Sequence, residues 1–67
     1  MEFRNFFHAF WRLGEEHREV LMLVGANGLS YERASEICGC EIGTVKSRVS
    51  RARKELRRIY SEETAAP

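Results

Sequence analysis

The sequence has a single proline among its 67 residues, at the last position, and it has no low-complexity segment and no internal repeat. Nothing inside the chain therefore marks a linker between domains. No apolar run approaches the roughly 18 residues that are needed to span a bilayer, and the start lacks the charged-then-apolar order of a signal peptide. We therefore expect a cytoplasmic chain that has no membrane segment.

Residue groups that carry chemistry are also scarce. No Ser/His/Asp arrangement and no phosphate-cradling glycine loop is present, and so short a chain leaves no spare length for a catalytic cleft. Cys38 and Cys40 are spaced C-x-C, whereas a structural zinc pair usually has C-x₂-C spacing and needs four ligands in all. We expect buried free thiols, no metal, no cofactor and no enzymatic activity. A metal or catalytic site that combines this pair with His8 and His17 is the alternative.

A chain of this length buries only roughly 60% of its unfolded surface, so every apolar face should be used. Residues 2–13 place one apolar stripe on a helix, formed by Phe3, Phe6, Phe7, Phe10 and Leu13. Two interpretations remain open: the stripe builds the core, or the part around Trp11 stays exposed as a docking patch. Gly14 is expected to end this helix, because glycine is unfavourable in a helix interior.

A second helix is expected from Glu15 through HREVLMLVGAN, with a stop at Asn27-Gly28. Ser30 is a good N-cap for a third, short helix over residues 31–38. Gly39 should end that helix after about two turns, since glycine commonly occupies the left-handed position that follows a helix.

The order that follows is short helix, tight glycine-containing turn, longer helix, which is a helix-turn-helix. Ser35 and Gly39 are small where the two helices would cross closely. The residues expected to fill the wedge between them are Ile37, Cys40, Val45 and Val49. We therefore predict an all-α, four-helix domain over residues 1–60, with a C-terminal helix-turn-helix, and a flexible tail over residues 61–67.

The last helix, residues 43–60, carries two incompatible surfaces. Its buried face is predicted by the spacing of Val45, Val49, Ala52 and Leu56. The opposite arc carries Gly43, Ser47, Ser50 and Lys54, with Lys46, Arg51 and Arg57 at its edges. Between Thr44 and Arg58, seven Lys or Arg stand against one Glu, a net charge of +6, whereas the whole chain carries +1. Such asymmetry indicates a polyanion that is bound by this one helix.

The alternative for this basic run is a solvated helix face that serves only solubility. A solubilising face usually interleaves both signs of charge to form i, i+4 pairs, and this one is nearly single-signed. Ser47 and Ser50 leave a shallow centre, and the longer cations reach its rims. A DNA major groove fits such a surface.

The run LSYERASEICGCEIGTVKSRVSRARKEL, residues 29–56, resembles region four of bacterial sigma factors, in particular the extracytoplasmic-function group. GTVKSR followed by RAR is the most specific part of this resemblance. Upstream, EEHREVLMLVGANG resembles the helix that precedes the motif in the same family. The output domains of many response regulators share the earlier part but typically have a His where this chain has Arg48.

The resemblance implies a domain that reads the minus-thirty-five element of a promoter while tethered to RNA polymerase, with its last helix in the major groove. By position, the family's base-edge contacts fall on Lys46, Ser47, Ser50 and Arg51, and its phosphate contacts fall on Thr44, Arg48 and Arg53. The outward arc adds Lys54 as a candidate for base edges. Arg57 is a further phosphate candidate, as is Gly43, where the helix N-terminus presents free N–H groups.

A rival function is that of a sigma-like protein-interaction module, which binds an anti-sigma factor without reading DNA. The aromatic first helix could serve that role. The intact basic face argues for DNA reading instead, and a sigma domain can do both in turn. The expected partners are promoter DNA, the RNA polymerase core and an anti-sigma factor.

Overall fold

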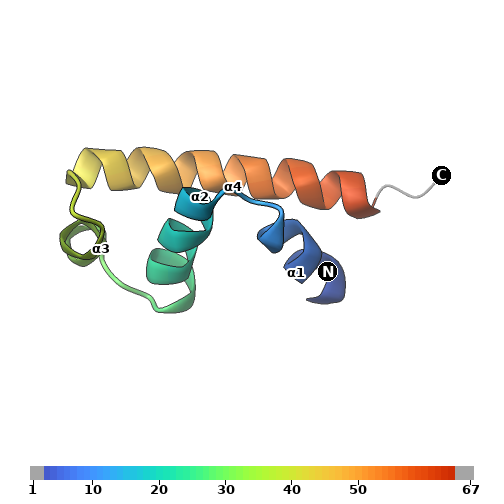
Figure 1. The fold of residues 1–67 in the computed structure, drawn as a ribbon, viewed down its shortest axis with the longest axis horizontal. Helices are drawn as coiled ribbons and strands as arrows, with labels where there is room; N and C mark the ends of the chain where they lie inside the picture. Colours follow the sequence, from blue (N-terminus) through green and yellow to red (C-terminus); the bar gives the residue numbers. More distant parts are fainter. Residues whose placement is uncertain (1–2, 65–67) are drawn as a thin grey trace.

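The structure, a computed structural model, describes residues 3–64, and over that range every regular element is a helix (Figure 1). The elements are α1 (Phe3–Trp11), α2 (Glu15–Val20), the π-helix η1 (Leu21–Ala26), α3 (Tyr31–Cys38) and α4 (Ile42–Thr64). Because η1 continues α2 without a break, the predicted all-α fold of four helices is confirmed. Among these helices, none is long and apolar enough to cross a bilayer.

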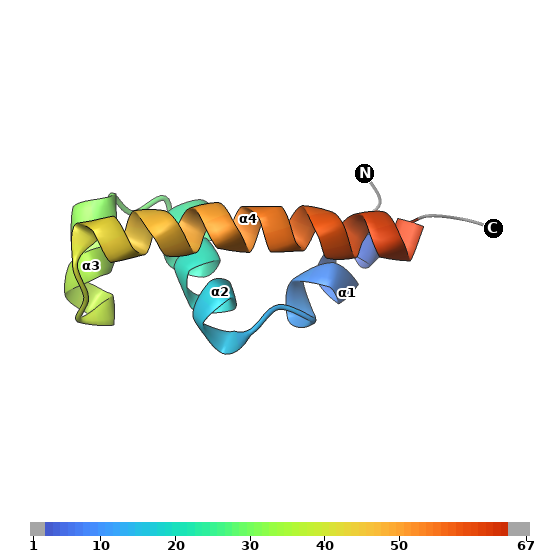
Figure 2. The same ribbon diagram turned by 90° about the horizontal axis from the view of Figure 1, so that it is seen from above.

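The longest helix, α4, is the element against which the others pack. Its 23 residues correspond to roughly 34 Å of helix. Figures 1 and 2 show α3 beneath its N-terminal end, α2 beneath its middle and α1 beneath its C-terminal half. One face of α4 is thus covered along its length, and the other is left to solvent.

Two small hydrophobic cores lie beneath α4. The first contains Val20, Ala34, Val45, Val49 and Ala52, and the second contains Ala9, Phe10, Leu13 and Ile59. Leu21 is partly buried and packs against both. The predicted inner face of the last helix is confirmed at Val45, Val49 and Ala52, whereas Leu56 is only half-buried.

The first helix ends at Trp11, shortly before Gly14, which adopts the extended backbone conformation at the start of α2. Arg18 of α2 reaches back to this connection. Its Nη1 donates to the carbonyl oxygen of Leu13 at 2.5 Å and to that of Trp11 at 3.4 Å. These bonds satisfy carbonyl groups that the end of a helix leaves without an internal partner, and they hold α1 and α2 together.

The second helix widens into the π-helix before it stops. The N–H of Asn27 donates to the carbonyl oxygen of Met22 at 2.9 Å, and that of Leu29 donates to Leu23 at 3.1 Å. Gly28 has a φ of 66°, in the left-handed region that favours glycine. The predicted helix stop at Asn27-Gly28 is therefore confirmed, although the last turns before it form a π-helix.

The turn of the helix-turn-helix follows the predicted residue chemistry. The Ser30 hydroxyl accepts the backbone N–H of Arg33 at 3.0 Å and caps α3. Gly39 ends α3 with a φ of 69°, and the N–H of Cys40 then donates to the carbonyl oxygen of Ser35 at 3.1 Å. The predicted cap and the predicted stop are both confirmed.

Two packing expectations at this turn are wrong. Ile37 is 53% exposed and fills no wedge between the helices, because the buried side of α3 is formed by Ala34. A Cβ atom at Gly39 would meet no atom within 4 Å. Glycine is therefore required there by its positive φ and not by a close crossing of the two helices.

The C-terminal end of α4 extends to Thr64, beyond the predicted end of the helix. Acidic residues in this extension lie close to Arg12 of α1, whose Nη1 is 3.4 Å from Glu63 Oε1 and whose Nη2 is 3.7 Å from Glu62 Oε1. The prediction of a flexible tail over residues 61–67 is therefore wrong for residues 61–64, which belong to α4. The remaining tail residues lie outside the described range.

Candidate nucleic-acid interface

The solvent-facing side of α4 carries a strip formed by the residues that were predicted to lie opposite the buried face. Its central residues, Gly43, Ser47, Ser50 and Lys54, are all exposed, and so are the cations Lys46, Arg51, Arg53 and Arg57. At 100° per residue, Arg51 lies on one flank of this strip, and Lys46 and Arg53 lie on the other. A shallow centre with cations on both sides is thus present on the second helix of the helix-turn-helix.

A polar groove of about 390 Å³ lies along one flank, between α4 and the first turn of α2. The lining residues that α4 contributes are all predicted DNA contacts: Gly43, Thr44, Ser47, Arg48 and Arg51. The opposite wall consists of Glu16 and His17 from α2. The sequence patterns did not assign these two residues to this interface, because no spacing along the chain relates them to α4 and only the packing of the helices brings them there.

Arg48 is the least exposed cation in this groove. Its side chain is 28% exposed, its Nε lies 3.8 Å from Glu16 Oε2, and its Nη1 donates to Cys40 Sγ at 4.0 Å. The contacts on both sides hold the guanidinium in the wall of the groove. A phosphate could approach this group only from the open side of the groove.

Lys46 and Arg53 stand apart from the polar groove. The Nζ of Lys46 lies 5.9 Å from the centre of the Tyr31 ring, a cation–π distance. Arg53 borders an apolar groove of about 510 Å³ that α4 forms with α1 and η1. The structure therefore brings together five of the predicted contacts and leaves these two on the opposite flank.

Toward the C-terminal part of the basic run, the charge of Arg58 is compensated locally. Its Nη2 lies 2.5 Å from Glu55 Oε1, and its Nη1 bonds Glu62. The hydrogen bond from Arg58 holds the pKa of Glu55 below its ordinary value, and the same bond raises the pKa of Arg58. Arg57, by contrast, keeps an exposed side chain whose Nε donates to the backbone carbonyl of Arg53 at 3.5 Å.

The two cysteines are free, and both are half-buried, not fully buried as predicted. The Cys38 thiol donates to Glu19 Oε1 at 3.2 Å. Burial, together with this bond to a carboxylate, raises the pKa of Cys38 to about 11. In the part of the chain that the structure describes, no three His, Cys, Asp or Glu side chains group closely enough to hold a metal ion.

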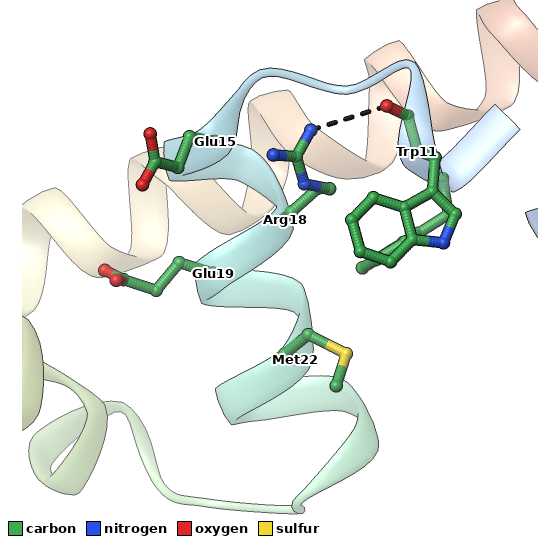
Figure 3. A pocket seen from close by; sticks show the side chains of 6 residues that line it. Trp11, Glu15, Arg18, Glu19 and Met22 are labelled. Carbon is green, nitrogen blue, oxygen red and sulfur yellow. Dashed lines mark hydrogen bonds between the residues drawn. The ribbon is translucent and has the colours of Figure 1, made fainter.

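An exposed aromatic surface is formed by α1, α2 and η1. A pocket of about 250 Å³ between α1 and α2 is lined by Phe10, Trp11, Glu15, Arg18, Glu19 and Met22 (Figure 3). Trp11 is 64% exposed, and the Arg18 guanidinium lies 5.2 Å from its ring centre. Phe7 and Met22 border the neighbouring apolar groove and are also exposed. Part of the apolar stripe of the first helix therefore stays exposed around Trp11, whereas Phe10 belongs to the core. The side chain of Phe3 is not among those that the structure describes.

Comparison with known families decides what kind of domain this is. The family described as sigma-70, region 4, matches residues 8–56, which is more than half of the chain. The chain belongs to the sigma-70 region 4 family. The resemblance seen in GTVKSR and RAR is thereby confirmed.

The relatives of this region 4 domain are sigma factors of the ECF group. It is 55% identical over 56 residues to the ECF RNA polymerase sigma factor EcfG of Rhodopseudomonas palustris, an alignment that covers 84% of this chain and 31% of that protein. It is 50% identical over 44 residues to the ECF RNA polymerase sigma factor SigC of Mycobacterium tuberculosis, covering 66% of this chain and 24% of the relative. The chain thus spans about a quarter to a third of the length of these relatives.

A solved structure supports the region 4 fold. The sigma factor RpoE from Bartonella quintana, crystallised in complex with the anti-sigma factor NepR, matches with a TM-score of 0.80 and 49% sequence identity. The match covers 88% of this chain and 37% of that one. The all-α helix-turn-helix architecture is therefore that of a known sigma factor domain.

Proposed function

We propose that this domain binds promoter DNA through the exposed strip of α4 and reads the minus-thirty-five element as part of a sigma factor that directs RNA polymerase. One observation carries the proposal. The second helix of the helix-turn-helix in a sigma-70 region 4 domain presents a serine-lined strip with cations on both flanks. The domain acts by binding alone, in the cytoplasm, where the polymerase works.

Side-chain placement suggests a division of labour along α4. The residues assigned to base edges are Lys46, Ser47, Ser50, Arg51 and Lys54, and those assigned to phosphates are Gly43, Thr44, Arg48, Arg53 and Arg57. Arg51 suits a base edge because its guanidinium can make a bidentate pair with guanine. Arg48 suits a phosphate because it lies in the groove wall beside Glu16 and Cys40, away from the centre of the strip.

A domain of this size should bind DNA modestly by itself. Single small modules bury about 600 to 1,000 Å² of protein surface on DNA. Tethering to RNA polymerase would raise the effective concentration of the domain at the promoter. The matches cover 31% and 24% of the sigma factors that it resembles, which agrees with a DNA-reading module that works within a larger protein.

Selection of duplexes from a random pool tests the proposal. The wild-type chain should enrich one short motif, whereas Ser47→Glu, which places a carboxylate at the centre of the strip, should enrich none. Ser61→Glu adds the same charge to an exposed residue at the far end of α4 and should leave the selection intact. The proposal is wrong if the wild-type chain enriches no motif, or if both variants select DNA equally well.

A second candidate function is the binding of an anti-sigma factor. The exposed side chains of Trp11, Phe7 and Met22 offer an apolar surface, and the RpoE structure that the chain resembles was solved with an anti-sigma factor bound. The two functions are compatible. Failure of the duplex selection would leave protein binding, through the surface around Trp11, as the better assignment.

A further inference from the structure

We propose, on the basis of the DNA-binding function proposed above, that Glu16 of α2 is an affinity-setting residue, which competes with DNA phosphate for Arg48. Glu16 belongs to a different helix from the predicted DNA contacts. It nevertheless lines the same groove as five of them, and its carboxylate lies 3.8 Å from the Nε of Arg48.

The charges around the groove make Glu16 distinctive. Among the described residues that line it, Glu16 is acidic, whereas Arg48 and Arg51 are cations. The Glu16 side chain is 73% exposed and that of Arg48 is 28% exposed. The carboxylate therefore stands at the solvent side of the groove, while the guanidinium lies deeper, between Glu16 and Cys40. His17, the other residue from α2, completes the wall on this side.

A phosphate that approaches Arg48 must meet this carboxylate. It either displaces Glu16 from the guanidinium, which breaks the Glu16–Arg48 ion pair, or binds beside it, which brings two like charges close together. Each outcome costs free energy that a neutral side chain at this position would not cost. The cost is independent of base sequence, because phosphates are the same in every duplex. Glu16 should therefore lower the affinity for all DNA and leave the discrimination between sequences unchanged.

Replacing Glu16 with Gln tests this role. The change keeps the size of the side chain and removes its charge. Fluorescence anisotropy should show that the affinity for the selected duplex and for a random duplex both rise by about 1.4- to fivefold, the range that exposed charge pairs give in double-mutant cycles. An affinity that stays the same or falls would refute the role of Glu16.

The neighbouring residue provides a matched control. Glu15→Gln makes the same change of net charge, but Glu15 lines the pocket beside Trp11 and Arg18 on another part of the surface. Its effect on DNA affinity should be much smaller, since Glu15 is not among the residues that line the groove with Arg48 and salt weakens the effect of exposed charges outside the contact. Equal gains from Glu15→Gln and Glu16→Gln would mean that only net charge matters and would overturn the proposal.

A double-mutant cycle with Arg48 completes the test. In an Arg48→Gln background, Glu16→Gln should give little or no gain, because the cation for which the carboxylate competes is absent. Circular dichroism verifies that each variant remains helical. If the wild-type chain and Glu16→Gln both bind no duplex, the DNA-binding function itself is wrong. If the wild-type chain binds and the full gain persists without Arg48, only the competition for Arg48 is wrong.

Discussion

At the scale of single residues, the shape of the outward face of α4 is set by the positions of its small and its long side chains. Ser47 and Ser50 keep the centre of the strip shallow, so that the helix axis can come close to a wide groove. Arg51 and Arg53 are the same residue type two positions apart, yet their surroundings differ. Arg51 lines the polar groove beside Glu16, whereas Arg53 borders the apolar groove formed with α1 and η1.

Substitution of these two arginines should therefore separate base reading from phosphate binding. Arg51→Ala should lower affinity for the selected duplex by about 1 to 3 kcal/mol and hardly change binding to random duplex, because one base contact is lost. Arg53→Ala should weaken binding to both duplexes and make the slope of log K against log salt shallower by about one unit. Anisotropy titrations of both variants with both duplexes measure these effects. Indistinguishable variants would mean that α4 docks in another orientation.

At the scale of the elements, the helix-turn-helix depends on backbone chemistry at its turn. Ser30 caps the start of α3, and Gly39 adopts the left-handed conformation that ends it. Within α4, Gly43 lies in a helical turn, where the backbone does not require glycine. An added Cβ would meet no atom within 4 Å at either Gly39 or Gly43. The two glycines therefore differ in backbone conformation and not in available space.

Alanine at these two positions should accordingly change stability in opposite directions. Gly39→Ala should destabilise the domain by about 1 to 2 kcal/mol, since an L-residue in the left-handed region is strained. Gly43→Ala should stabilise it by up to about 1 kcal/mol, because alanine loses less backbone entropy in a helix. Urea unfolding followed by circular dichroism measures both. A stabilising Gly39→Ala would contradict the role assigned to the turn.

At the scale of the whole molecule, α4 is shared between two cores and one charged surface. Its N-terminal half completes the core with α2 and α3, and its C-terminal half packs on α1. At the far end, Glu62 and Glu63 face Arg12 of α1, and Arg58 is engaged by Glu55 and Glu62. The cations expected to contact DNA run along the outward side of α4 from Lys46 to Arg57, and all are exposed except Arg48, which lies in the groove wall beside Glu16.

The dependence of DNA affinity on salt measures how many of these cations bind phosphate. If about four cations neutralise phosphates, log K should fall with log salt at a slope of roughly −3 to −4, near −0.9 per phosphate. Titration at several salt concentrations gives the slope. Arg4→Ala, which removes an exposed cation on α1, is the control and should leave the slope unchanged. A slope near zero would mean that the basic run is only a solvated face.

Local chemistry determined much of this domain from the sequence alone. The helices, the cap at Ser30, the stop at Gly39 and the outward arc of α4 follow from residue type and from a repeat of 100° per residue. These features involve neighbours within one or two turns, so no knowledge of distant contacts is needed. The basic strip was predictable for the same reason, since all its residues belong to one helix.

Contacts between helices were decided only by the tertiary structure. The exposure of Trp11 and Ile37 depends on which part of each apolar stripe a neighbouring helix covers. The extension of α4 accompanies ion pairs between its acidic end and Arg12 of α1. Glu16 and Arg48 meet because α2 packs across α4. Each of these contacts joins residues far apart in the chain, and periodicity within a single helix contains no information about which other helix will face it.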